Sequence, residues 1–395
     1  MSRRRFIRGI YSGETDFCSL HVWGFINNNS SSQKLPVSTR IHPMQASLGK
    51  MIFQYIFQLQ TKMKQRLLYI DEMRGLAILL VTIGHRFFVH TSEGACHPTN
   101  QAIYSFHMAF FFFLSGFMLA KTHNIQNLGF KGFFKKKFIS LILPWLSWTL
   151  IIPWYIIHGL SYNLECFNRL LFFPNVGYWF LPVLFLFMIV WAVVYLLFSS
   201  NQRPGGGKSG RLVGYLLICI LMSVIGVITR QYFLLIYSIY FLCFVLGESI
   251  SIYERLECFI QKKIIVGCCA LLLLLCWKLG PLLSEGNALK SMLNVIYNLI
   301  CSVSACIVLY NVFKTVKLPR FLAIYLSETG KYSLSIYLIP VVIFPLSLTL
   351  PSDWSVSAIN ISIILIALCD NTVRYLLGRV INEIPVIRYI LMGKK

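Results

Sequence analysis

The chain has 395 residues, of which 57% are hydrophobic and only 13% are charged, and its formal net charge is +22 at pH 7. Soluble domains carry about 25% charged residues, so this composition excludes an ordinary soluble globular protein. The positive charge does not indicate nucleic-acid binding, because it is concentrated in short segments between long apolar runs.

The apolar runs are each long enough to cross a hydrocarbon core of about 30 Å. Backbone groups in lipid must be hydrogen-bonded internally, and the runs are too long for barrel strands, so the sequence predicts an all-α bundle of membrane-spanning helices. We expect ten spans, near residues 70–90, 103–120, 138–158, 177–198, 212–229, 232–250, 264–282, 291–313, 332–351 and 355–377.

The basic residues predict the topology of these spans. With a cytoplasmic amino terminus, the inside segments hold 31 of the 36 Lys and Arg residues, including the five from Arg374 onward. Cytoplasmic loops of membrane proteins carry such an excess. We therefore expect both termini in the cytoplasm and a multi-pass protein of a cytoplasmic-type membrane.

Residues 1–62 are polar and basic and include "NNNSSSQ". Two explanations fit this composition: an extension that is disordered, or an over-extended reading of the gene whose true start is Met63. Residues 63–395 form one continuous predicted membrane domain.

The first span contains "RGLAILLVTIGH", which begins at Arg74 and ends at His85. Both side chains project from nearly the same helix face, about 16 Å apart along the axis. Ionisable groups inside a membrane are costly and mark function by default. His85 suits a general base or proton relay, and a histidine bonded between helices is the structural alternative. Arg74 lies at the cytoplasmic end of the span, where its guanidinium could bind a phosphate. The alternatives are that its side chain extends to the membrane surface or that it forms an i,i+3 ion pair with Asp71.

The second span, "FHMAFFFFLSGFMLAK", places His107 near its outer end and the pair Ser115-Gly116 toward its inner end. Two small residues in succession let another helix or a ligand approach the backbone. The twelve cysteines are scattered through apolar segments without paired CxxC units or a Cys/His cluster, so no metal site is predicted.

These two spans together resemble the membrane-bound acyltransferase-3 family. The family's first-span marker is an Arg, ten residues and a His, which Arg74 and His85 match, and its second-span marker is an aromatic run ending in Ser-Gly-Phe. "GYWFLPVLF" (177–185) and "GKYSLSIYLIP" (330–340) are similar to two later segments of the family. The resemblance covers residues 66 to about 390.

The resemblance implies transfer of an acyl group, most directly acetyl from acetyl-CoA, to a sugar hydroxyl. His85 is then the general base and Arg74 lies at the coenzyme site. The coenzyme site also includes Ser115, Gly116 and the lysine run at residues 135–137. The alternative for the lysine run is that it only marks a cytoplasmic loop by its positive charge. His107 and Trp179 become candidates for sugar contact, and Trp179 also suits an interfacial anchor. The three members of the lysine run are Lys135, Lys136 and Lys137.

The chain departs from the family pattern at two positions. Pro340 stands where the family often has His, so no catalytic role is assigned there. Ser140 stands where the family often has Arg, and the lysine run must supply that positive charge. The family context implies a bacterial cytoplasmic membrane and an acceptor such as an exopolysaccharide, an O-antigen sugar, a peptidoglycan sugar or a lipid-linked precursor.

Two other classes of protein stay open at the level of sequence. A proton-coupled transporter of a glycan or small metabolite would also use buried His and Arg, although the chain shows no internal repeat. A structural membrane subunit would need His85 for folding alone. Within the enzyme class, succinyl or another short acyl group is the alternative to acetyl.

Overall fold

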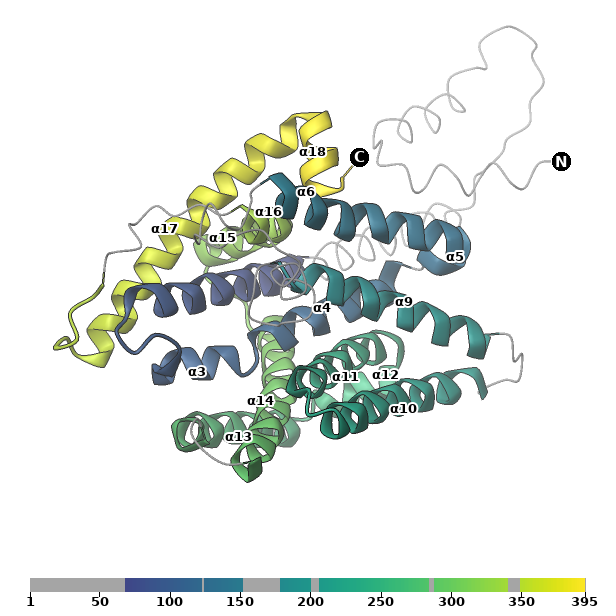
Figure 1. The fold of residues 1–395 in the computed structure, drawn as a ribbon, viewed down its shortest axis with the longest axis horizontal. Coiled ribbons are helices and arrows are strands. Elements are labelled where there is room, and N and C mark those ends of the chain that lie inside the picture. The colour runs from purple at the N-terminus through teal and green to yellow at the C-terminus, as the bar shows by residue number, and fades with distance from the viewer. Residues whose placement is uncertain are drawn as a thin grey trace, which may run out of the picture. The chain divides into compact units, whose positions relative to one another are not determined.

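The computed structural model describes residues 68–122, 124–151, 178–199, 206–283, 288–339 and 349–394 (Figure 1). Over these ranges the regular structure is helical and contains no strand, which confirms the predicted all-α fold. The predicted extension at 1–62 and the alternative start at Met63 lie outside the described residues, and so does Pro340.

The first described helix covers residues 68–90 and is called the first helix below. A π-helical segment, Phe138–Ile142, joins α5 to α6 without a break. The remaining helices, in chain order, are α3 (Pro98–Tyr104), α4 (His107–Thr122), α5 (Asn124–Lys137), α6 (Leu143–Ile151), α9 (Phe180–Ser199), α10 (Gly206–Ile228), α11 (Tyr232–Ile252), α12 (Glu254–Ile260), α13 (Lys263–Leu283), α14 (Ala288–Thr315), α15 (Arg320–Lys331), α16 (Ser333–Leu338), α17 (Val356–Glu383) and α18 (Pro385–Met392).

Six of the described helical stretches are long and apolar enough to cross a membrane, or seven if the bent pair α12 and α13 is one span. The bend between these two helices is 60°. Three of the ten predicted spans, 138–158, 177–198 and 332–351, run partly outside the described residues. The count of ten and the cytoplasmic placement of both termini therefore stay predictions.

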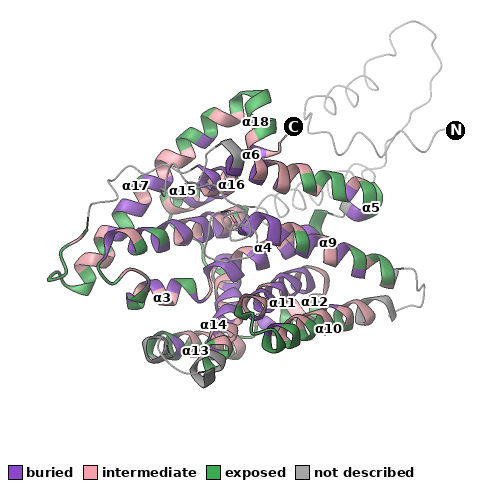
Figure 2. Ribbon diagram, viewed as in Figure 1, coloured by how far each residue is buried: buried purple, intermediate pink, exposed green. Residues whose placement is uncertain are grey.

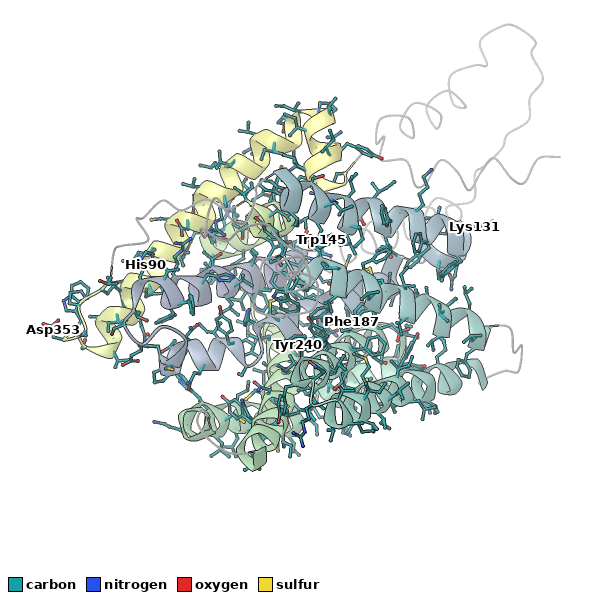
Figure 3. All side chains as sticks on the ribbon, in the orientation of Figure 1. His90, Lys131, Trp145, Phe187, Tyr240 and Asp353 are labelled. Atoms are coloured by element: carbon teal, nitrogen blue, oxygen red, sulfur yellow. The ribbon has the colours of Figure 1, made fainter. Side chains whose placement is uncertain are left out.

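The core lies where α4, α9 and α11 meet, and buried residues concentrate there while α10, α13 and α17 carry many exposed ones (Figure 2). Phe112 of α4 is fully buried and packs against Phe180, Phe187 and Tyr240, with ring centroids 4.9 to 5.2 Å apart. Figure 3 shows Phe187 and Tyr240 within this region. The aromatic run of the second span is thus a packing element, and it sets the position of α4.

Helices α4 and α11 touch backbone to backbone. A Cβ added at Gly116 would overlap the carbonyl of Phe244, and one added at Gly247 would overlap the carbonyl of Phe113. Small residues at such crossings allow the close approach by which membrane helices associate. The two glycines therefore allow the close contact between α4 and α11 at the centre of the bundle.

Candidate active site

The first helix carries the two ionisable residues that the sequence singles out. Arg74 forms an ion pair with Asp71, one turn earlier, at an N–O distance of 3.5 Å, as the i,i+3 spacing predicts. The Arg74 side chain keeps 32% of its surface exposed. Since a guanidinium has five N–H donors in a planar fork, one carboxylate leaves donors for a second anion.

Two glycines fix this end of the first helix against α15. A Cβ added at Gly75 would overlap the backbone of Leu326, and one added at Gly330 would overlap the backbone of Asp71. Glycine is required at both positions because any side chain would separate the two helices. Gly330 opens the late segment that resembles the family, so the contact gives that glycine a structural role.

Two lysines from distant parts of the chain lie near Arg74. Lys137, at the end of α5, and Lys394, just after α18, are each within range of electrostatic interaction with the Arg74 guanidinium. We call Arg74, Lys137 and Lys394 the basic cluster. The structure thus brings Lys137 of the predicted lysine run to Arg74, and it leaves Lys135 and Lys136 exposed to solvent.

The carboxyl-terminal segment reaches the basic cluster because α18 docks on α6. Side chains of Ser147 and Trp148 donate hydrogen bonds to the last carbonyls of α18, at 2.9 and 3.0 Å. Gly393 then adopts the left-handed conformation that ends the helix, with φ 60°, and lies against the backbone of Ile139. Sequence reasoning missed Lys394, because no local pattern shows where a terminal lysine docks.

Burial and mutual repulsion lower the pKa of both lysines in the basic cluster. Burial is the main cause for Lys137, followed by the charges of Lys136 and Arg74, and together they lower its pKa to about 8. Burial also lowers the pKa of Lys394, with Arg388 and Arg74 contributing. An anion bound among these cations would cancel the repulsion, so the cluster has the electrostatics of an anion site.

His85 is enclosed by protein and is nevertheless accessible to solvent. Many protein atoms surround the residue, and its neighbours Gly84 and Arg86 are buried, yet His85 itself is exposed. His85 is therefore packed among neighbouring helices and still keeps exposed surface. Tyr104, which is 39% exposed, packs against Gly84 and borders this stretch. A reacting group can therefore reach His85.

Charged side chains from two helices lie around His85. Arg86 forms an ion pair with Asp370 of α17, and the two side chains are only 4% and 0% exposed. Arg374, one turn after Asp370, and Arg86 both lie within electrostatic range of His85. We call Arg86, Asp370 and Arg374 the interior charge cluster. The sequence predicted no place in the active site for any of these three residues.

The position of Arg374 differs from its use in the topology argument. Its place near the basic carboxyl terminus in sequence predicts a cytoplasmic residue. In the structure it lies within α17, the last of the helices long and apolar enough to span a membrane, and interacts with Arg86 and Asp370. The reason is that Asp370 offers an opposite charge inside the bundle, one turn away on the same helix face.

His107 begins α4 and is buried, with 4% of its surface exposed. Its Nδ1 lies 2.9 Å from the carbonyl of Ile103, so the geometry assigns the ring proton to Nδ1 and leaves Nε2 as an acceptor. The ring also packs edge-on against Tyr104, with centroids 4.8 Å apart, and lies within electrostatic range of His85. The two histidines of the predicted site are therefore neighbours.

Trp179 and the pair Ser115-Gly116 lie in packed surroundings. Trp179 is 7% exposed and stacks on Tyr237 and Tyr240, at centroid distances of 6.0 and 5.9 Å. Ser115 Oγ donates to a carbonyl of its own helix at 2.8 Å. Gly116 is covered by α11. The sequence left open whether a helix or a ligand approaches this glycine, and in the structure it is a helix.

The described chain therefore presents a partly exposed cationic site and an accessible histidine at separate places along one helix. Comparison with known proteins adds one finding. The family model for an acyltransferase domain of the acyltransferase-3 type matches residues 67–369. The chain belongs to the acyltransferase-3 family. No curated protein and no solved structure gave a match.

The membership makes this protein a membrane acyltransferase with several spans. The match begins just before the first helix and ends at residue 369, so it includes Arg74 and His85. Asp370 and Arg374 follow immediately after it. Ser140, where the family often has Arg, donates its hydroxyl to the carbonyl of Lys137 at 3.2 Å. This contact supports the backbone at the end of the lysine run.

Proposed function

We propose that this acyltransferase moves an acyl group, most directly acetyl from acetyl-CoA, to a hydroxyl of a cell-surface or lipid-linked carbohydrate. The observation that carries the proposal is the pair of sites along the first helix. A basic cluster lies at Arg74, and the accessible His85 lies about 16 Å further along the helix axis. That spacing suits a donor with phosphates at one end and a thioester at the other.

The basic cluster would hold the phosphates of the coenzyme. Arg74 offers a planar fork of donors, and Lys137 and Lys394 add positive charge from other directions. Coenzyme A is a cytoplasmic metabolite, which agrees with the predicted cytoplasmic placement of this end. The pantetheine arm would then run beside the first helix toward His85. Gly116 has no part in this proposal, because α11 covers it.

His85 would act as the general base and then as the general acid. The acceptor hydroxyl attacks the thioester carbonyl carbon, a C–O bond forms, and the hydroxyl proton passes to the imidazole. When the C–S bond breaks, the imidazolium returns this proton to the leaving thiolate, which departs as free coenzyme A thiol. Direct attack of this kind needs no covalent enzyme intermediate and no metal.

The acceptor would approach His85 from the end of the first helix opposite Arg74. His107 is the best placed of the predicted sugar contacts, because it lies near His85 and beside the exposed Tyr104. Trp179 is reached by a sugar only if the rings stacked on it move. We place the protein in a bacterial cytoplasmic membrane, with an exopolysaccharide, O-antigen, peptidoglycan or lipid-linked sugar as acceptor.

The deciding experiment measures hydrolysis or exchange of radiolabelled acetyl-CoA by detergent-purified protein. We expect His85→Ala to lower turnover by about 10²- to 10⁴-fold, the usual contribution of a general base. Binding of acetyl-CoA to this variant should be nearly unchanged. Full turnover in His85→Ala would overturn the assignment of the base, and succinyl-CoA in parallel tests the alternative acyl group.

A proton-coupled transporter is the second candidate, and the interior ion pair of Arg86 and Asp370 favours it. Ionisable pairs inside membrane bundles often mark ion pathways. The discriminating measurement is binding of coenzyme A to the folded wild-type protein. A folded protein that binds no coenzyme A would exclude the enzyme as proposed and favour the transporter.

A further inference from the structure

We propose that Arg374 of α17 is a second catalytic residue, which stabilises the negative charge that develops on the thioester carbonyl oxygen. This inference rests on the proposed acyl transfer at His85. It assigns the residue that receives the oxyanion, a role that neither Arg74 nor His85 fills.

Contacts along the first helix show how α17 runs beside it. Arg86 pairs with Asp370, and Thr82 Oγ1 donates a hydrogen bond of 3.4 Å to Oδ1 of Asn371. Further along α17, Tyr375 Oη donates a hydrogen bond of 3.4 Å to Glu328 of α15. Since α15 packs against the Asp71 end of the first helix, α17 runs antiparallel to that helix.

This direction places Arg374 on the donor side of the Arg86–Asp370 pair. Four residues of helix separate Asp370 from Arg374, or about 6 Å along the axis. That displacement moves Arg374 from the level of Arg86 toward the end that carries Arg74. A thioester that reaches His85 from Arg74 would therefore pass Arg374.

The two arginines of the interior charge cluster differ in what they can offer to a substrate. Arg86 is 4% exposed at its side chain and is held by Asp370. Arg374 is partly exposed and lies within electrostatic range of His85 and of Tyr178. Arg374, which also interacts with Asp370, is thus the more exposed of the two guanidinium groups near His85. Arg86 and Asp370 hold their helices in register.

The chemistry needs a cationic donor at this place. Attack of the acceptor hydroxyl converts the carbonyl oxygen into an oxyanion while His85 takes the proton, and collapse expels the thiolate, which His85 reprotonates. A guanidinium fixed before the reaction stabilises that oxyanion without reorganisation. Arg74 cannot do this from about 16 Å away along the helix axis.

The test compares Arg374→Gln, Arg374→Lys and Arg374→Ala with wild type in acetyl transfer by purified protein. Arg379→Gln is the matched control, because Arg379 is an exposed arginine on the same helix. We expect Arg374→Gln to lower kcat by about 10²- to 10³-fold, as for loss of one oxyanion donor. The KM for acetyl-CoA should change little, since Arg374 does not bind the phosphates.

A purely structural role for Arg374 is distinguished by chemical rescue. Added methylguanidinium should restore part of the kcat of Arg374→Ala and none of that of His85→Ala, because only the former leaves a guanidinium-sized space. Normal kcat in Arg374→Gln overturns the inference, and so does a loss of activity that methylguanidinium does not restore in Arg374→Ala. Absence of acetyl transfer by wild type would instead count against the proposed function.

Discussion

Gly116 of α4 lies against the carbonyl of Phe244 in α11, so the backbones of two central helices are in contact. Any side chain at Gly116 must push α11 away from the core. We expect Gly116→Val to destabilise the protein by about 1–3 kcal/mol, the usual cost of overpacking. Gly267→Val on α13 is the control, because no atom lies within 4 Å of a Cβ there. Thermal unfolding in detergent measures both, and equal midpoints would contradict the packing role.

Arg74 should matter for donor binding more than for turnover. Arg74→Ala removes a charge-assisted contact worth about 1.5–3 kcal/mol, so the KM for acetyl-CoA should rise about 10- to 100-fold. Lys394→Gln should raise KM in the same direction. Lys131→Gln serves as control, since Lys131 is exposed on α5 and points away from the helices (Figure 3). A control that raised KM equally would show that total charge, not the cluster, holds the donor.

Donor affinity should fall at alkaline pH because of Lys137. Burial and neighbouring cations lower the pKa of this lysine to about 8, so it is charged below that pH and neutral above it. The KM for acetyl-CoA should therefore rise as the pH increases from 7 to 9. Lys137→Arg keeps its charge over this range and should show a flatter profile. Identical profiles for the variant and the wild type would assign the pH dependence to another group.

Removing the charge of only one member of the buried Arg86–Asp370 pair should lower the stability of the protein. Asp370→Asn leaves the guanidinium without its charged partner, and breaking such pairs costs about 3–5 kcal/mol. The double variant Arg86→Met with Asp370→Leu removes both charges and should unfold at a higher temperature than Asp370→Asn. If the double variant were the less stable of the two, the pair would contribute more than charge compensation.

The all-α fold and most of the helices followed from hydrophobic runs, because each run must satisfy its backbone in lipid. The aromatic run at residues 110–113 was apolar enough either to pack in the core or to face lipid, and the structure shows that Phe112 packs in the core. The Arg74–Asp71 pair was predictable because its spacing is local. These features need no knowledge of how distant segments meet.

The remainder of the site depends on contacts between distant segments. Lys394 reaches Arg74 only through the docking of α18 on α6. Arg374 looked like a cytoplasmic charge because it lies near the basic carboxyl terminus in sequence, while Arg86, which pairs with the neighbouring Asp370, is far away in sequence. The burial of Trp179 depends on rings of α11. A single sequence contains these side chains but not their pairing.

The contact between the first helix and α17 also bears on how the chain enters the membrane. Thr82 and Asn371, which meet there, are 289 residues apart, and the Arg86–Asp370 pair lies alongside them. At about 5–20 residues per second of synthesis, the ribosome needs about 15 to 60 s to make the intervening chain. During that interval Arg86 has no Asp370 to neutralise it. The charge of Arg86 can therefore be neutralised by this partner only after Asp370 in α17 has been synthesised.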